Sequence, residues 1–255
     1  MKINKIVNFW ANKGLSNQYS STFSSIKFFD YIDNACQIKH LKKILMNHFN
    51  RKYLRILDVG AGLGRLTIPL AEAGHYVIAL EAADSIYEDL SKKTKNLSNI
   101  KCLNILFEDY LNKFDHQIFD VIIFSGVLYF YNNNSLSKVI HKSKNILDNS
   151  GIIIIRDTFS KNSLIKKSIV DSEIYCYYRP FNFWNSIFLR ESMKIKKNYS
   201  CNLQIPLIKR LFNLGIKVFG NSFENAIYKI GKLKIIVTIS HLYRITNLEK
   251  YLYYD

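Results

Sequence analysis

The sequence predicts an α/β fold with a doubly wound, mainly parallel sheet, and three observations support this prediction. Apolar runs of strand length recur along the chain, segments with helical spacing lie between them, and a glycine-rich turn follows the first run. This alternation is typical of βαβ units, in which helices cover both faces of a parallel sheet. The strand-like runs are 54–59, 76–80, 100–107, 119–126 and 151–157.

Helices are predicted between these runs. The segments with helical spacing are 66–74, 85–97 and 135–151, and the last ends at Gly151, a residue suited to the turn before a strand. Residues 1–45 precede the first strand and are rich in aromatic side chains. We expect them to form an N-terminal helical cap on a domain that spans 46–255.

The pattern changes after the fifth predicted strand. We expect residues 158–180 to be an insertion, 181–193 a helix, and 194–202 and 232–240 the last strands. The segment 205–230 is apolar and basic, so an amphipathic element packed on the sheet, a lid, and a partner-facing or membrane-surface helix are all open for it.

Composition restricts the class of protein. The chain has 255 residues, of which 48% are hydrophobic, and it is therefore long enough to bury one large core. A formal net charge of +16 favours anionic partners, although a general Lys, Asn and Ile bias explains so scattered a charge equally well. The four cysteines lie far apart with no C-x-x-C pair, which argues against a disulfide framework or a structural zinc.

The sequence shows no sign of a membrane or secretory segment. No stretch approaches the ~18 consecutive apolar residues of a membrane span. Asn8 and Asn12 interrupt the apolar core that a signal peptide would need at the N-terminus. We therefore expect a cytoplasmic protein.

The segment most informative about function is DVGAGLG, residues 58–64, which follows the first predicted strand. A glycine-rich turn between a strand and a helix lets backbone amides approach a ligand closely. A dinucleotide site would need Gly or Ala at position 65, where this chain has Arg65. Glu81 ends the second strand 21 residues after Gly60, where a carboxylate can accept hydrogen bonds from ribose hydroxyls.

With these residues the sequence resembles the class I S-adenosylmethionine-dependent methyltransferases. LFEDYLNKF (106–114) resembles the family's adenine-binding segment, FDVIIFSGVLYF (119–130) its fourth strand, and LDNSGIIIIRD (147–157) its fifth strand. The resemblance covers residues 50–157 well and the final strands weakly. It implies a Rossmann-like sheet of seven strands with the last one antiparallel, S-adenosylmethionine as cofactor and S-adenosylhomocysteine as product.

The resemblance also implies which residues surround the cofactor. They come from the glycine turn, the end of the second strand, the adenine segment and the end of the fourth strand. The residues are Asp58, Gly60, Ala61, Gly62, Gly64, Glu81, Ala82, Asp109, Tyr110 and Ser125. Asp58 is expected to orient the turn, and Asp109 has the alternative role of a helix N-cap.

Methyl transfer is an in-line displacement in which the protein aligns the acceptor and supplies a base only where the acceptor must lose a proton. The family's usual histidine after the fourth strand is absent, because the chain reads GVLYFY at 126–131. His116 and His141 are expected to be surface or core residues. Tyr129 is a poor base at neutral pH, since an ordinary tyrosine has a pKa near 10.

Candidate acceptor-side residues follow the fourth and fifth strands and end the insertion. They are Tyr129, Arg156, Asp157, Tyr178 and Arg179. Two arginines beside tyrosines suit a phosphate-bearing acceptor, because guanidinium groups pair with phosphate oxygens. A surface pair of Arg156 with Asp157 and a tyrosine-rich core flank are the alternative.

We therefore predict methyl transfer to a small, anionic, oxygen-bearing acceptor. An example is a phosphorylated or nucleotide-linked precursor in capsule or other surface-polysaccharide biosynthesis. A phosphoramidate modification of a capsule is a specific case. No metal is expected, because Asp157 alone is well placed among acidic residues. DNA is not expected either, because the chain lacks an N/D-P-P-Y/F loop. RNA methylation and a methyltransferase-like protein that only binds ligands are the alternatives.

Overall fold

The computed structural model describes residues 3–15, 27–158, 164–167, 174–200 and 249–254. The chain divides into two compact units, one made of 1–19, 51–199 and 250–255 and the other of 20–50 and 200–249. The first unit contains the sheet and every predicted site residue. In the second, the described part is essentially one helix, α2 (Lys27–His48).

Five parallel strands form the centre of the sheet, in the order β3-β2-β1-β4-β5. Their bounds are Arg55–Val59 for β1, Tyr76–Leu80 for β2, Ile100–Leu103 for β3, Phe119–Ser125 for β4 and Leu147–Thr158 for β5. Each overlaps a predicted strand, so the predicted parallel α/β architecture is confirmed. The order reverses between β1 and β4, which is where ligands bind in open α/β sheets.

Beyond β5 the strand order continues with β9 (Glu249–Tyr254) and then β8 (Ile195–Ser200). β8 overlaps the strand predicted at 194–202, whereas the sequence did not indicate β9. The strand predicted at 232–240 lies outside the described residues, as does the segment 205–230. The antiparallel direction of the last strand therefore stays a prediction.

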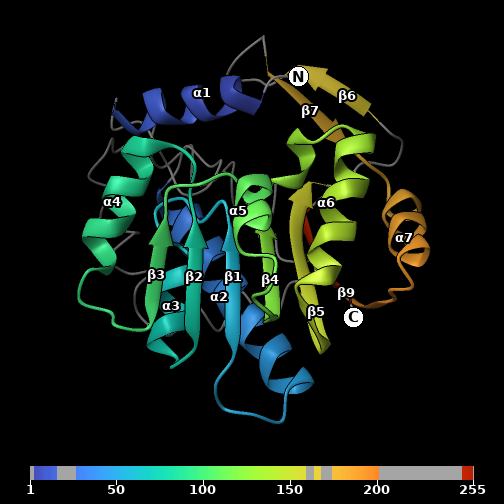
Figure 1. The fold of residues 1–255 in the computed structure, drawn as a ribbon, viewed down its shortest axis with the longest axis horizontal. Coiled ribbons are helices and arrows are strands. Elements are labelled where there is room, and N and C mark those ends of the chain that lie inside the picture. The colour runs from blue at the N-terminus through green and yellow to red at the C-terminus, as the bar shows by residue number, and fades with distance from the viewer. Residues whose placement is uncertain (1–2, 16–26, 159–163, 168–173, 201–248, 255) are drawn as a thin grey trace, which may run out of the picture. The chain divides into compact units, whose positions relative to one another are not determined.

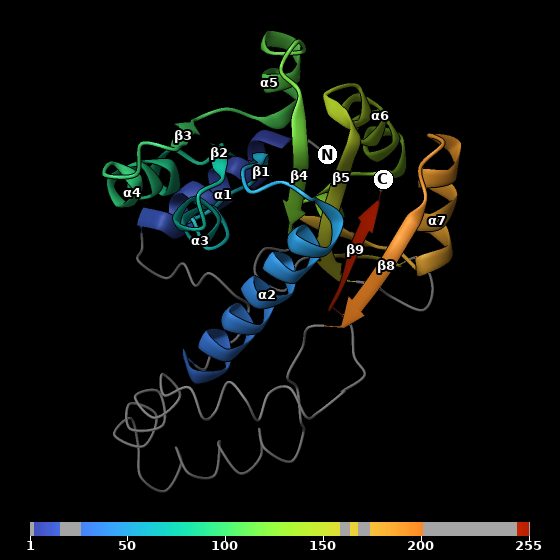
Figure 2. The ribbon, with the colours of Figure 1, turned by 90° about the horizontal axis from the view of Figure 1, so that it is seen from below.

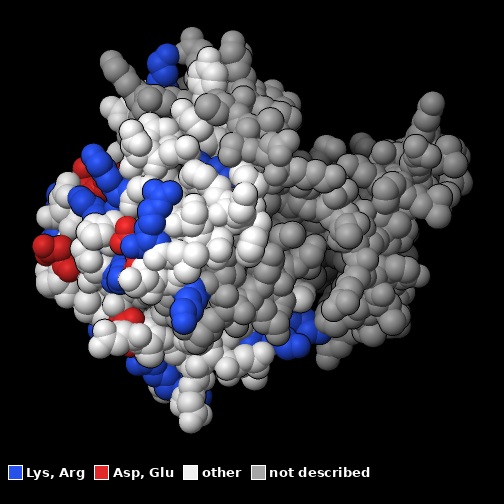
Figure 3. Space-filling view, turned by 90° about the vertical axis from the view of Figure 1, so that its right-hand side faces the viewer, with Lys and Arg blue, Asp and Glu red and all other residues white. Residues whose placement is uncertain are grey.

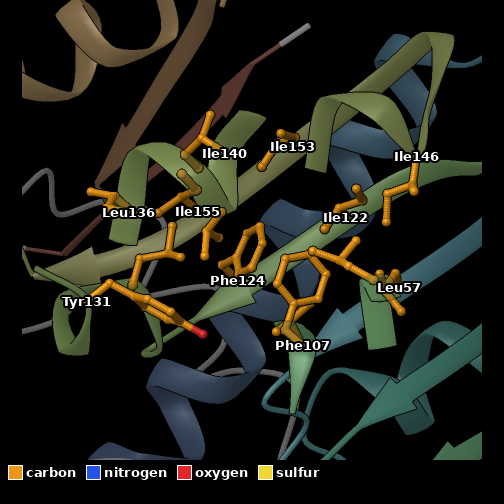
Figure 4. Packing of buried hydrophobic residues seen from close by; sticks show 14 of the residues in the cluster. Leu57, Phe107, Ile122, Phe124, Tyr131, Leu136, Ile140, Ile146, Ile153 and Ile155 are labelled. Atoms are coloured by element: carbon orange, nitrogen blue, oxygen red, sulfur yellow. The ribbon is translucent and has the colours of Figure 1, made fainter. Parts of the chain in front are cut away.

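The central strands consist of apolar side chains because both faces of the sheet are covered. Ile122 and Phe124 on β4, and Ile153 and Ile155 on β5, are fully buried and point into one cluster (Figure 4). Phe107 packs edge-on against Phe124 with 5.3 Å between ring centroids. This packing fixes the end of β4 against the helix that follows β3.

Helices lie on both faces of the sheet (Figures 1 and 2): α5 (Phe107–Lys113) and α6 (Asn133–Asn145) on one, α3 (Thr67–Glu72) on the other. α4 (Asp84–Thr94) follows β2 and contacts α1 (Ile3–Leu15), where the Ser85 hydroxyl donates to the Ala11 carbonyl at 2.6 Å. The predicted helical cap at 1–45 thus contains α1 and all but the last three residues of α2. These helices fall in different compact units, so the cap itself stays a prediction.

Three predicted boundaries were wrong, and one of them is the end of the helix predicted at 135–151, because α6 ends at Asn145. β3 ends at Leu103, because Phe107 begins α5 and turns its ring into the core. β5 begins at Leu147 rather than 151, because Leu147 pairs with Phe119 before a register shift in the β4–β5 ladder.

The predicted insertion 158–180 contains an antiparallel pair of strands, β6 (Leu164–Lys167) and β7 (Tyr175–Tyr178). The predicted helix follows as α7 (Phe181–Arg190). Figure 1 shows β7 and α1 beyond the carboxyl ends of the central strands. Between β4 and α6 the chain makes a short 3-10 turn, η1 (Leu128–Phe130).

Candidate functional site

The glycine turn after β1 uses backbone conformations that other residues rarely adopt. Gly60, Gly62 and Gly64 have φ values of 70°, 58° and 81°, in the left-handed region that favours glycine. A Cβ on Gly60 would lie 2.5 Å from the Cγ2 atom of Val127, just beyond β4. The turn therefore packs directly against the segment that follows β4.

Glu81 holds the turn from the end of β2. Its Oε2 accepts a hydrogen bond from the Gly62 amide and its Oε1 accepts one from the Ala83 amide, both at 2.9 Å. Burial raises the pKa of this carboxyl above its ordinary value, although the amide hydrogen bonds oppose the shift. A carboxylate has about four acceptor positions, so Glu81 keeps capacity for ligand hydroxyls beside these two bonds.

Asp58 is buried at the end of β1 and accepts a 2.6 Å hydrogen bond from the Thr67 hydroxyl. Burial raises its pKa, while that hydrogen bond and the charge of Arg65 act in the opposite direction. Because Thr67 is the first residue of α3, Asp58 ties the two ends of the glycine turn together. This contact supports the predicted orienting role.

Arg65 is a site residue that the sequence analysis missed. In the sequence it is only a mismatch to a dinucleotide site, which indicates no role. Its Nη2 donates to the Ser125 hydroxyl at 2.9 Å, which brings a guanidinium group to the carboxyl end of β4. The signal that could have indicated it is its position directly after the third glycine.

The predicted adenine segment is divided between surface and core. Asp109 lies exposed in the first turn of α5, and Leu106 occupies the N-cap position, so the alternative N-cap role of Asp109 is not observed. The Tyr110 side chain is fully buried, and its hydroxyl donates to Gln117 at 2.5 Å. Only the main chain of Tyr110 is therefore suited to contact a cofactor.

Gly126 and Tyr129 lie at the carboxyl end of β4. Gly126 has φ 73° and its amide donates to the Arg156 carbonyl at 2.8 Å, which joins the ends of β4 and β5. Tyr129 is buried and stacks on Tyr178 with 6.3 Å between ring centroids. Burial, followed by the charge of Asp157, raises the pKa of Tyr129 well above 10. Its phenol is therefore neutral at pH 7.

Arg156, Asp157 and Arg179 are all buried, so Arg156 and Asp157 do not form the surface pair that was the alternative. Arg156 is the sheet partner of Ser125. The Arg179 guanidinium donates to the carbonyls of Tyr131 and Tyr177 and to Asn133. The structure thus groups Glu81, the glycine turn, Ser125 and Arg156 at the strand ends, whereas Arg179 bonds to the protein.

Comparison with known proteins agrees with this geometry. Residues 56–151 match the model of a family described as a methyltransferase domain. An uncharacterized methyltransferase of Staphylococcus carnosus is 26% identical over 131 residues, which cover 51% of this chain and 58% of that protein. Phosphoethanolamine N-methyltransferase 1 of Triticum aestivum is 28% identical over 138 residues, covering 52% of this chain and 26% of that protein.

Among solved structures, magnesium protoporphyrin IX methyltransferase of Synechocystis, with bound S-adenosylmethionine, matches with a TM-score of 0.64 at 13% identity. The match covers 98% of this chain and 95% of that one. Residues 56–151 therefore contain a methyltransferase domain, and the fold is that of the Synechocystis enzyme, whose bound S-adenosylmethionine is the cofactor predicted for this chain.

The described residues also bear on contact with a membrane and on metal binding. No helix among them is long and apolar enough to cross a membrane. In the same part of the chain, no group of three or more His, Cys, Asp or Glu residues could hold a metal ion. The chain spans only 58% and 26% of the lengths of the two curated relatives.

Proposed function

We propose that the protein transfers a methyl group from S-adenosylmethionine to an oxygen atom of a small, phosphate-bearing acceptor. This proposal rests on two arginines that both neighbour Ser125. Arg65 donates to the Ser125 hydroxyl, and Arg156 is the parallel-sheet partner of Ser125. Residues paired across a parallel ladder project to the same face of the sheet, so positive charge is concentrated at this strand end.

The cofactor is assigned to the adjacent turn. Glu81 would accept hydrogen bonds from the ribose hydroxyls, and the main chain around Gly60 and Gly62, whose amides donate to Leu80 and Glu81, would lie against the methionine part of the cofactor. A glycine is required at position 60, since a Cβ there would meet Val127. The bound cofactor supplies an electrophilic methyl group on a sulfonium ion. The protein's task is to align that methyl group with the acceptor and exclude water.

Among the described residues of the acceptor side, no tyrosine or histidine is suited to act as a general base, which favours an acceptor that is already anionic. Burial raises the pKa of Tyr129 well above 10 and that of Tyr178 to about 12. Both phenols therefore already carry their protons at neutral pH, and neither can act as a base. The His116 and His141 side chains are 74% and 62% exposed. A phosphate oxygen needs no deprotonation: the new O–CH₃ bond forms as the S–CH₃ bond breaks, and neutral S-adenosylhomocysteine leaves.

One relative is by name a phosphoethanolamine N-methyltransferase, which supports a small, phosphate-bearing acceptor but not the choice of an oxygen atom. Within this class we retain a precursor of a surface polysaccharide, including a phosphoramidate-modified capsule, as the narrower expectation. The protein would then act in the cytoplasm, where nucleotide-linked precursors are made.

The test is a transfer assay with methyl-labelled S-adenosylmethionine. The phosphate-bearing acceptors are phosphoethanolamine and UDP-N-acetylglucosamine. Their controls without phosphate are ethanolamine for the first and N-acetylglucosamine for the second. We expect label in phosphate-bearing acceptors alone, with the methylated atom identified by NMR. Arg156→Met should lower acceptor kcat/KM by roughly tenfold to a hundredfold, as expected when hydrogen bonds to a charged group are lost. Arg190→Met, at an exposed position on α7, is the control.

Transfer to a control lacking phosphate, or unchanged turnover in Arg156→Met, would contradict the anionic-acceptor proposal.

Total RNA is included as a further acceptor because of the net charge of +16. On the face in Figure 3, however, the described Lys and Arg residues are scattered rather than gathered. Binding of S-adenosylhomocysteine without transfer to any acceptor would support the non-catalytic alternative.

A further inference from the structure

Arg179 is buried in a protein-lined environment rather than directed at a substrate. It is 2% exposed. Its guanidinium lies over three aromatic rings, with 5.4 Å to the centroid of Tyr177, 5.2 Å to Phe183 and 5.9 Å to Trp184. These rings fix the plane of the group and shield it from water.

The guanidinium donates mainly to main-chain carbonyls. Nη2 donates to the Tyr131 carbonyl, and Nη1 reaches the Leu128 carbonyl at 3.4 Å and the Tyr177 carbonyl at 3.1 Å. Nε donates to the Asn133 side chain at 3.1 Å. One side chain therefore joins the end of the insertion to the η1 segment, which we define as residues 126–133.

The η1 segment touches the cofactor site at two other places. Val127 packs against Gly60 so closely that a Cβ there would be 2.5 Å away. The Tyr131 hydroxyl donates to Glu108 at 3.1 Å, and Glu108 lies in the predicted adenine segment. Hence the segment contacts the glycine turn, the adenine segment and the insertion.

We propose that Arg179 is a positioning residue for the cofactor site, which it serves by fixing the main chain of the η1 segment against the glycine turn and the adenine segment. A planar fork with five donors can hold carbonyls at several positions at once. A lysine ammonium is a single point charge and cannot span them. This inference rests on the cofactor assignment and is independent of which acceptor is used.

The first experiment measures amide hydrogen exchange in Arg179→Lys and in the control Arg190→Lys. Exchange in peptides covering 126–133 is expected to accelerate at least severalfold in Arg179→Lys, while the central strand β1 keeps its protection, because only the local tie is lost. Arg190→Lys should match the wild type. Equal acceleration in all peptides would show a general destabilisation and overturn the proposal. An unchanged exchange rate in peptides covering 126–133 would also overturn it.

The second experiment is calorimetric titration with S-adenosylhomocysteine. Arg179→Lys is expected to raise Kd about threefold to thirtyfold, the range found for residues that act on a site through others. Tyr131→Phe, which removes the bond to Glu108 but keeps the carbonyl that Arg179 binds, should weaken the same ligand. Wild-type affinity in both variants would refute the coupling.

Chemical rescue separates positioning from a general structural role. In Arg179→Ala, methylguanidinium should restore both protection at 126–133 and affinity for S-adenosylhomocysteine, at concentrations that do not alter the wild type. Failure of rescue in a folded variant counts against the proposal. If the wild type does not bind S-adenosylhomocysteine, the cofactor assignment fails instead, and the exchange and rescue data still decide whether Arg179 fixes the segment.

Discussion

At the scale of single residues, Glu81 gives the most direct test of the cofactor site. Glu81→Ala is expected to weaken S-adenosylmethionine binding by about 1–3 kcal/mol, because charge-assisted hydrogen bonds to a buried ligand are lost. Calorimetry with S-adenosylhomocysteine provides the measurement. Glu72→Ala, at an exposed position on α3, is a control that should leave affinity unchanged.

Glu81 also bonds to the amides of Gly62 and Ala83, so the alanine variant loosens the turn as well as removing a ligand contact. Glu81→Gln keeps one carbonyl oxygen and most of the volume, and should therefore lose less affinity than Glu81→Ala. Wild-type affinity in the alanine variant would show that the ribose lies elsewhere.

At the scale of elements, the glycine turn and the η1 segment are expected to function as one packed unit. Gly60→Ala should lower the free energy of unfolding by about 2–4 kcal/mol, since it combines left-handed strain with overpacking against Val127. It should also abolish measurable binding of S-adenosylhomocysteine. Urea unfolding and calorimetry on the same samples measure the two effects.

Gly74→Ala is the matched control for this variant. Gly74 also has a positive φ, 93°, but its Cβ would meet only the exposed Tyr53 ring at 3.3 Å. Stability should fall there while ligand affinity is kept. In the Gly60→Ala background, Val127→Ala should recover part of the loss by removing the colliding methyl group. No recovery would mean that backbone strain alone accounts for the effect.

The sequence predicted those elements that have a local pattern. The five parallel strands are apolar runs, and the glycine turn and Glu81 have a fixed spacing. β5 begins earlier than predicted because pairing of Leu147 with Phe119, and not local hydrophobicity, defines its start. Arg65 donates to Ser125, 60 positions away, and the Arg179 guanidinium donates to Tyr131, 48 positions away. No local pattern in the sequence indicates contacts over such separations.

At the scale of the whole molecule, two buried carboxyl groups make stability depend on pH. Burial raises the pKa of both Asp58 and Glu81 in the folded state, so the native state retains protons that the unfolded chain has already released. Stability is therefore greatest below the unfolded pKa values near 4 and declines as pH rises through the folded ones. Ionisation of these two buried carboxyl groups therefore destabilises the folded state at neutral pH. This is consistent with a site that is retained for binding.

The corresponding prediction concerns the slope of stability against pH. The free energy of unfolding of the wild type, minus that of Asp58→Asn/Glu81→Gln, should fall as pH rises from about 4 towards 7, because only the wild type ionises these groups. Hydrogen bonds from Ser150 lower the pKa of Asp148, so the same difference for Asp148→Asn should instead fall as pH decreases. Urea titrations at a series of pH values measure both differences. Slopes of the same sign in the two comparisons would contradict the burial of Asp58 and Glu81 as ionisable groups.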